Sequence, residues 1–214
     1  MTKRIIFITE NINKFTELQN YLQNYCATSS TKCNISLEML KPDTEINEIQ
    51  SLNQEEIVMH KLYDAVITCQ HLFTFKPELN EEVWFLVEDT SLCISKLGGL
   101  PGPFIKFFLK SIALSDIGND NWGSEAQSCV NLAISRLSNS EYGNIEFNIT
   151  KNFNGVIHGH ILNVRGTNGF GFDPIFRPVN SNKTNAEMSI EEKASYNPRI
   201  LAFHKVLDYL VHTI

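Results

Sequence analysis

The chain has 214 residues, of which 43% are hydrophobic and 20% charged, a composition typical of a globular protein and not of a disordered one. Its formal net charge of −6 excludes the basic surface that non-specific binding to DNA or RNA requires, so we expect no nucleic-acid partner. No stretch approaches the roughly 20 apolar residues that span a bilayer, and the apolar run at residues 5–8 is too short for a signal peptide, so we expect a cytoplasmic protein without membrane contact.

The first half of the chain interleaves short apolar runs with helical patterns. The apolar runs predict buried strands over residues 4–9, 35–40 and 83–87, the last leading directly into Glu88-Asp89-Thr90. Apolar side chains at helical spacing predict two helices between these strands, one through Phe15, Leu18, Leu22 and Tyr25 with Asn11 or Asn13 as its cap, and one over residues 55–69.

The middle of the chain begins with the segment Leu97–Pro103. It holds three glycines and two prolines, which predict an unusual backbone instead of a regular element. We expect a short helix from Phe104 to Leu109 and a loop over residues 115–124. Apolar residues that recur about every 3.6 positions predict a helix over residues 125–137.

The last third is expected to hold two paired strands and a final helix. Alternation predicts a strand over residues 145–149, paired with one over 156–164 through a turn near Asn154-Gly155. Ser189 and Glu192 match a capping box. Asn197 and Pro198 predict the start of a helix that buries Leu201, Leu207, Leu210 and Val211. Because strands and helices interleave without strict alternation, we predict a single α/β domain over residues 1–214 with a mixed sheet.

The five cysteines are Cys26, Cys33, Cys69, Cys93 and Cys129, an odd count with no C-x-x-C pair. This usage favours free thiols in a reducing compartment over a disulfide framework or a zinc site.

Two polar segments that follow predicted strands are candidates for a metal and phosphate site. Glu88 and Asp89 come after a buried strand, and carboxylate oxygens are the ligands that magnesium prefers. The turn from Thr9 to Lys14 opens a helix, where backbone N–H groups and a lysine suit a phosphate, although no Walker A motif is present. A strand end that turns into solvent, and an ordinary turn with a solvated lysine, explain the same residues without a site.

Two segments near the C-terminus are candidates for further ligand contacts. Arg199 at a helix start, with Lys193 six residues before it, suits a phosphate. Phe170-Gly171-Phe172-Asp173 offers two aromatic rings, a glycine that admits a flat group, and an acceptor for a purine N–H. The structural alternatives are a plain capped helix and a turn at Asp173-Pro174.

Taken together and in order, four segments resemble the inosine triphosphate pyrophosphatase family. Residues 9–14 are similar to the family's opening T-G-N-x-x-K, and residues 87–92 to its V-E-D-T-x-L. Leu97 to Lys106 matches L-G-G-L-P-G-P-Y-I-K almost letter for letter, and residues 170–176 resemble F-G-W-D-P-x-F. The resemblance runs over essentially the whole chain, and the third motif is long enough to be highly specific.

The resemblance implies an elongated, two-lobed α/β fold with a curved mixed β-sheet, a substrate cleft between the lobes, and a homodimer. It implies a magnesium-dependent enzyme, with manganese as an alternative metal. Such an enzyme hydrolyses aberrant purine nucleoside triphosphates such as ITP, dITP and XTP to the monophosphate and pyrophosphate, which cleanses the nucleotide pool.

The family's functional residues carry over by position. Glu48 and Glu88 would be metal-associated, and Asp89 would be the general base. Glu88 and Asp89 would also contact the substrate, and the other substrate-binding residues form one set. The phosphates would be held by Thr9, Asn11, Lys14 and Lys61. The base would be contacted by Phe170, Phe172 and Asp173, helped by Lys193 and Arg199. The remaining substrate-binding residues would be Glu10, Ile12, Asn13, Gly171 and Pro198.

Three positions depart from the family's pattern. Glu10 replaces a glycine of the opening motif, Asn13 replaces a lysine often found there, and Pro198 stands where the family has a histidine that contacts the base. These changes leave two alternatives open: a pyrophosphatase for methylated, pyrimidine or other modified nucleotides, and a nucleotide-binding sensor without turnover. The pair Glu88-Asp89 argues against the sensor, since binding alone does not need a base.

Overall fold

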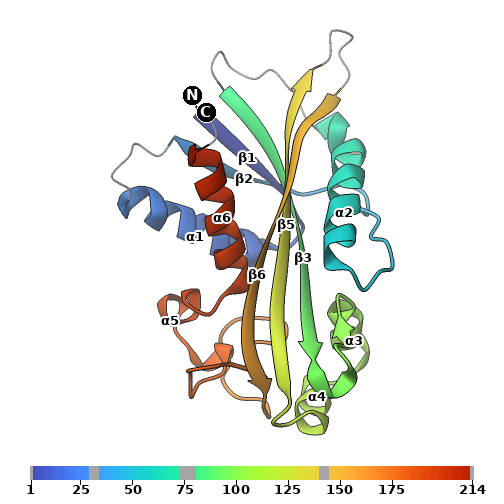
Figure 1. Ribbon diagram of the computed structural model, residues 1–214, viewed down its shortest axis with the longest axis vertical. Coiled ribbons are helices and arrows are strands. Elements are labelled where there is room, and N and C mark those ends of the chain that lie inside the picture. The colour runs from blue at the N-terminus through green and yellow to red at the C-terminus, as the bar shows by residue number, and fades with distance from the viewer. Residues whose placement is uncertain (1, 29–33, 73–80, 140–144, 213–214) are drawn as a thin grey trace. The chain divides into compact units, whose positions relative to one another are not determined.

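The computed structural model describes residues 2–28, 34–72, 81–139 and 145–212. They form one mixed sheet in the order β2-β1-β3-β5-β6-β7, with β4 paired to β3 outside this path (Figure 1). The strands are β1 (Thr2–Ile8), β2 (Ile35–Leu40), β3 (Glu81–Ile94), β4 (Pro101–Gly102), β5 (Glu125–Asn139), β6 (Ile145–Ile161) and β7 (Phe176–Pro178). The α-helices are α1 (Ile12–Thr28), α2 (Gln54–Cys69), α3 (Ile105–Ser111), α4 (Leu114–Asp120), α5 (Ile190–Ala194) and α6 (Pro198–His212). The predicted α/β class with a mixed sheet is confirmed.

The N-terminal part of the sheet is parallel. β1 lies between β2 and β3 and runs parallel to both, whereas β4 and β7 pair antiparallel with β3 and β6. The chain leaves β1 through α1 to reach β2 on one side, and then returns through α2 to β3 on the other side. This reversal makes the carboxyl end of β1 a topological switch point, where open α/β sheets commonly bind ligands.

The chain divides into two compact units, which share the long strands β3, β5 and β6. The first comprises residues 1–88, 132–153 and 203–214, and the second comprises residues 89–131 and 154–202. No helix of the described ranges combines the length and apolar character needed to cross a membrane.

The first unit has a core on each face of its strands. Ile6 and Phe85 point to one face, where they pack with Leu62 of α2. Trp84 points to the opposite face, because side chains alternate along a strand, and its ring meets the Tyr209 ring of α6 at 6.1 Å. Figure 1 accordingly shows α2 on one side of these strands and α1 and α6 on the other.

The second unit is built around an apolar cluster that includes Ile94, Ile105 and Phe176. The predicted unusual backbone after β3 is confirmed: Gly98, Gly99 and Gly102 all have positive φ, and the Leu100–Pro101 peptide bond is cis. This turn brings β4 back against β3 and leads into α3.

Two predictions for residues 115–137 are wrong. Helix α4 occupies most of the expected loop, and the expected helix over 125–137 is strand β5. Ala126 and Val130 fit a helical period, but Glu125 and Gln127 are exposed while Ala126, Ser128 and Val130 are buried, which is the period of a strand. Further along, residues 130–135 are buried throughout because β5 lies inside the sheet, and continuous burial hides the alternation.

The predicted hairpin near Asn154-Gly155 is also wrong, because β6 is one continuous strand. Gly155 meets a different need: a Cβ built there would lie 1.9 Å from the carbonyl oxygen of Pro198 and 3.0 Å from the amide nitrogen of Ala202. The glycine therefore permits close approach of β6 to the start of α6, and does not make a turn. The strand over residues 145–149 was predicted from alternating apolar and polar side chains, and these side chains lie outside those that the structure describes.

The C-terminal predictions are confirmed at the helix start and wrong in part of the core. Ser189 and Glu192 form a capping box, and α6 begins at Pro198 after Asn197. Leu207 and Leu210 are fully buried, but Leu201 is 40% exposed and Val211 is 38% exposed. These two side chains lie at the edge of the buried stripe, where spacing alone does not decide burial.

The cysteine prediction holds in part. Cys69, Cys93 and Cys129 are free thiols, as expected. Cys26 is disulfide-bonded, so the expectation of free thiols throughout is wrong for this residue.

Candidate functional site

The turn between β1 and α1 is organised by its own polar side chains. Asn11 caps α1: its Oδ1 accepts hydrogen bonds from the amide nitrogens of Asn13 at 3.0 Å and Lys14 at 3.2 Å. Its own amide donates to Oγ1 of Thr9 at 3.1 Å. These bonds fix the first turn of α1 and therefore the position from which Lys14 extends. The side chains of Glu10, Ile12 and Asn13 are exposed in the same turn.

Lys14 contacts the first of the two predicted acids. Phe7 pairs with Leu86 across the parallel strands, so Thr9 follows β1 at the level of Glu88. The ammonium nitrogen of Lys14 lies 3.0 Å from Oε1 of Glu88, whose side chain is only 2% exposed. A buried carboxylate requires such a partner, because its desolvation is otherwise costly.

Lys61 connects the second metal candidate to the same place. Its Nζ lies 2.5 Å from Oε1 of Glu48 and donates to the backbone carbonyl of Glu88 at 3.0 Å. Lys61 projects from α2, and Glu48 lies in the segment before that helix. The structure thus brings Lys14, Lys61, Glu48 and Glu88 together in the first unit, although they are spread over more than 70 residues of sequence. We call these four residues the switch-point cluster.

The oxygen donors of the switch-point cluster suit a hard divalent cation. Glu48 and Glu88 supply carboxylates, and Glu88 also supplies a carbonyl oxygen, the ligand types that Mg²⁺ accepts. The described residues contain no group of three or more His, Cys, Asp or Glu side chains able to hold a metal. Mg²⁺ usually takes only one or two carboxylates together with substrate phosphates, so two glutamates fit this mode of binding.

Glu88 and Asp89 do not stand at a strand end, contrary to the sequence prediction. Strand β3 continues through both of them to Ile94. Their side chains therefore leave opposite faces of the strand. Asp89 is itself buried, with 7% of its surface exposed.

In the second unit, Asp173 organises the loop that was predicted to meet a base. Its Oδ2 accepts from the amide of Phe170 at 2.8 Å and lies 2.8 Å from the ammonium of Lys193. Its Oδ1 accepts from the side chain of Asn185 at 3.4 Å. The carboxylate is thus used mainly to hold the loop closed and to place Lys193.

The two phenylalanines of this loop have different surroundings. Phe172 is a core residue, 8% exposed, and its ring packs edge-on against Phe176 at 6.3 Å. Phe170 is half-buried, with the Lys193 ammonium 5.0 Å and the Arg199 guanidinium carbon 5.6 Å from its ring centroid. Phe170, Lys193 and Arg199 therefore form one cationic and aromatic group.

Arg199 is held in place by the start of α6. The Oδ1 of Asn197 accepts from the Arg199 amide at 2.9 Å, which caps the helix as predicted. Pro198 is buried, and its carbonyl packs against Gly155. Gly171 is exposed with a positive φ of 64° at the turn between the two phenylalanines.

Two residues that contact Asp173, Gly169 before the loop and Asn185 in a later segment, were not predicted from the sequence. Gly169 has a positive φ, and a Cβ there would lie 2.2 Å from Oδ2 of Asp173, so the carboxylate occupies the space of its missing side chain. The repeated Gly-Phe pattern before Asp173 is the signal that would have indicated it. Asn185 is 2% exposed and donates to Asp173, but nothing in its sequence surroundings distinguishes it from a surface asparagine.

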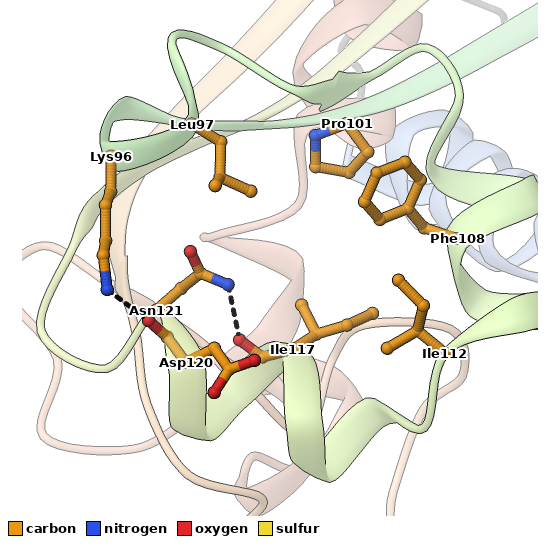
Figure 2. Close-up of a pocket in the computed structure, with 8 residues that line it drawn as sticks. All are labelled: Lys96, Leu97, Pro101, Phe108, Ile112, Ile117, Asp120 and Asn121. Carbon is orange, nitrogen blue, oxygen red and sulfur yellow. Dashed lines mark hydrogen bonds between the residues drawn. The ribbon is translucent and has the colours of Figure 1, made fainter.

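A mainly apolar pocket of about 310 Å³ lies elsewhere in the second unit. Figure 2 shows side chains from residues 96–101 and from residues 108–121, which include parts of α3 and α4, around this pocket. Lys96 donates a hydrogen bond to the Asp120 carbonyl, and Asn121 donates one to the Ile117 carbonyl. None of the predicted site residues lines it. Its lining consists of Lys96, Leu97, Pro101, Phe108, Ile112, Ile117, Asp120 and Asn121.

Comparison with known proteins gives full-length matches. Residues 5–209 match the Ham1 family. The chain is 33% identical to the dITP/XTP pyrophosphatase of Saccharolobus solfataricus, covering 97% of this chain and 93% of that protein. It is 32% identical to the inosine triphosphate pyrophosphatase of Saccharomyces cerevisiae, covering 96% and 95%.

Solved structures agree at the level of the fold. A HAM1 protein from Coxiella burnetii superposes with a TM-score of 0.69 at 20% identity, covering 100% of both chains. The Ham1 protein of Staphylococcus aureus gives a TM-score of 0.62 at 22% identity, covering 97% of this chain and 98% of that one.

Proposed function

Because the chain belongs to the Ham1 family, we propose that it is a nucleoside-triphosphate pyrophosphatase. Its substrates would be noncanonical purine nucleoside triphosphates such as ITP, dITP and XTP, which it would hydrolyse to the monophosphate and pyrophosphate. The relatives at 33% and 32% identity are a dITP/XTP pyrophosphatase and an inosine triphosphate pyrophosphatase, and their names support this substrate class.

The observation that carries the proposal is the switch-point cluster. Two lysines and two glutamates converge beside the capped N-terminus of α1, a combination that suits phosphates and a cation together. Thr9 and Asn11 shape the turn, and Lys14 and Lys61 supply the positive charges. An ion-pair network with only a structural role could lie anywhere in the fold. This cluster lies at the carboxyl end of β1, beside β3, at the topological switch point where such sheets commonly bind ligands.

Magnesium fits the charge of this cluster. The two ammonium groups and the two carboxylates cancel, so the four side chains offer no net positive charge to a triphosphate. Glu48 and Glu88 are the residues that would hold Mg²⁺, or Mn²⁺ in its place. When bound, the ion would neutralise phosphate charge and favour departure of pyrophosphate.

Asp89 is the proposed general base. It would orient a water molecule and accept its proton as the water oxygen attacks the α-phosphorus in line with the leaving pyrophosphate. Its position next to Glu88 on β3 gives it a rigid backbone, because β3 is paired and buried here. A single general base typically contributes about 100- to 10,000-fold to the rate.

The group formed by Phe170, Lys193 and Arg199 is the proposed contact for the base. Lys and Arg side chains only donate hydrogen bonds, so they would favour the 6-oxo acceptor of ITP and XTP and disfavour the 6-amino donor of ATP. Asp173 would act by placing Lys193. With Pro198 in place of the histidine in the family's pattern, we expect weaker discrimination than in its relatives.

The test is pyrophosphate release from ITP, XTP, dITP, GTP and ATP in the presence of magnesium. We expect ITP, XTP and dITP to have specificity constants about tenfold or more above that of ATP, since an unpaired buried donor penalises the wrong base. Equal specificity constants for ITP and ATP would contradict the proposed specificity.

The same assay separates the two alternatives. Faster release from methylated or pyrimidine nucleotides than from ITP would favour a pyrophosphatase for other modified nucleotides. Saturable ITP binding by calorimetry without pyrophosphate release would favour a sensor.

The proposal also includes a homodimer in the cytoplasm that acts on free nucleotides and not on nucleic acid, in keeping with the net charge of −6.

A further inference from the structure

Two cysteines of the second unit, Cys93 and Cys129, lie against each other on neighbouring strands. Cys93 belongs to β3 and Cys129 to β5, which are adjacent in the sheet. Both are free thiols, both are half-buried, and their side chains share a hydrogen bond. Neither belongs to the switch-point cluster or to the group around Phe170, so the proposed function leaves them unexplained.

The shared hydrogen bond makes the two sulfurs chemically unequal. The bond from Cys129 lowers the pKa of Cys93 to about 6, against the opposing effect of burial, and Ser91 assists with its Oγ at 3.9 Å from the sulfur. The same bond, together with burial, raises the pKa of Cys129. Of the two sulfurs, Cys93 therefore ionises more readily and Cys129 holds its proton more firmly, the arrangement of an attacking thiol beside a resolving thiol.

Cys69 provides an internal contrast. It is a free thiol of α2 with no exposed surface, and burial raises its pKa to about 11. It is therefore protonated at neutral pH and shielded from solvent, which makes it unreactive.

We propose that Cys93 and Cys129 are an oxidisable thiol pair that closes reversibly to a disulfide between β3 and β5 when the protein meets a hydroperoxide. The Cys93 sulfur attacks one peroxide oxygen, the O–O bond breaks, and with hydrogen peroxide the products are a sulfenic acid and water. The Cys129 sulfur then attacks the sulfur of the sulfenic acid, the S–O bond breaks, and a second water leaves with the thiol proton. Two thiols and one hydrogen peroxide thus give one disulfide and two waters, and a dithiol reductant reverses the change.

Strand geometry permits this bond. Neighbouring strands lie about 4.8 Å apart, and directly opposed residues have Cα atoms about 4.5 or 5.5 Å apart, inside the range of about 4.4–6.8 Å that a disulfide spans. β3 and β5 are neighbours in the sheet and the two thiols interact through their side chains, so the disulfide would join groups that are already in contact. Partial exposure of both residues gives a small peroxide access.

The experiment is a peptide map of the full-length protein before and after hydrogen peroxide, with remaining thiols blocked by N-ethylmaleimide. We expect a peptide pair joined through Cys93 and Cys129 after oxidation, absent before it and lost again with dithiothreitol. In the reduced protein, Cys93 should react with N-ethylmaleimide at least about tenfold faster than Cys69, as expected for a readily ionised thiol compared with a buried one. The joined pair should vanish in Cys93→Ser and in Cys129→Ser and persist in the matched control Cys69→Ser.

Three outcomes would overturn the proposal. The first is separate alkylation of Cys93 and Cys129 after peroxide treatment that oxidises an exposed model thiol. The second is oxidation of Cys93 only to a sulfinic acid, and the third is a disulfide from either cysteine to a different partner. The wild-type map decides among these by itself, so a variant that fails to fold does not leave the question open. The peptide map detects a covalent bond and does not depend on turnover. It therefore tests the thiol pair independently of the proposed pyrophosphatase activity.

Discussion

Lys61 is the residue on which the proposed metal site depends most. Its ammonium joins Glu48, in an irregular segment, to the backbone of Glu88, in a buried strand. The Lys61 ammonium therefore links the Glu48 segment to β3 within the switch-point cluster. An exposed carboxylate on a loop becomes a usable ligand only when such a contact holds its position.

Asp89→Asn should leave the fold intact and reduce turnover by about 100-fold or more, as expected for loss of a general base. Asparagine keeps the shape of the buried side chain but cannot accept the proton. The measurement is kcat for ITP with saturating magnesium. Asp116→Asn, on the exposed surface of α4, is the matched control and should keep full activity. A kcat for Asp89→Asn within threefold of the wild type would show that Asp89 is not the base.

Activity should also require a divalent cation. Excess EDTA should abolish pyrophosphate release, and Mg²⁺ or Mn²⁺ should restore it, because the side-chain charges of the switch-point cluster cancel and leave the phosphates without a counter-charge. Glu48→Gln should raise the Mg²⁺ concentration for half-maximal activity by about tenfold or more, in line with loss of a metal-site carboxylate. The control is Glu45→Gln at a neighbouring exposed glutamate. Full activity in excess EDTA would contradict the requirement for a divalent cation.

At the scale of elements, the sequence was most informative where a single signal acted alone. The capped starts of α1 and α6 and the existence of strand β2 follow from local side chains, and all were predicted correctly. β5 was mistaken for a helix because it is an interior strand whose buried set includes Ser128, Asn131 and Ser135. Buried polar residues carry no hydrophobic period, so the pattern that identifies a strand was missing.

The candidate site shows the same division. The turn residues Thr9 to Lys14 and the loop residues Phe170 to Asp173 could be named as candidates from the sequence, since their motifs are local. What Asp173 does was not predictable, because its partners Lys193 and Asn185 are contributed by a segment that folds back over the loop. Likewise, the contact between Lys61 and Glu88 depends on how α2 packs against β3, which no local pattern encodes.

Gly155→Ala tests the packing of β6 against α6. The added methyl would overlap the carbonyl oxygen of Pro198, and backbone cannot move aside as a side chain can. We expect a loss of about 1–3 kcal/mol in the free energy of unfolding, the usual effect of overpacking, measured by urea denaturation. Val156→Ala at the exposed neighbouring position is the control and should change stability by less than about 1 kcal/mol. An unchanged urea midpoint for Gly155→Ala would mean that the helix start yields without strain.

At the scale of the whole molecule, exposed aromatic surface bears on assembly. The sequence left open whether Phe104, Phe107 and Phe108 fill the core or form an interface. Phe108 packs against the core of the second unit, whereas Phe107 on α3 is 59% exposed. Trp122, just after α4, is 64% exposed. Large exposed rings are unfavourable in water and are enriched at the centre of protein interfaces, so Phe107 is unexplained by the monomer's own core.

We therefore predict a homodimer in solution, with Phe107 in the interface, since two-fold dimers are the commonest closed assembly. Light scattering at micromolar concentration should give about twice the mass of one chain. Phe107→Glu should shift the mass to that of the monomer, because a two-fold interface would place two glutamates close together without partners. Lys110→Glu, at an exposed position of the same helix, tests whether added negative charge alone has this effect and should leave the dimer intact. A wild-type mass of one chain would exclude the dimer at that concentration, and a dimer that survives Phe107→Glu must be held together by another surface.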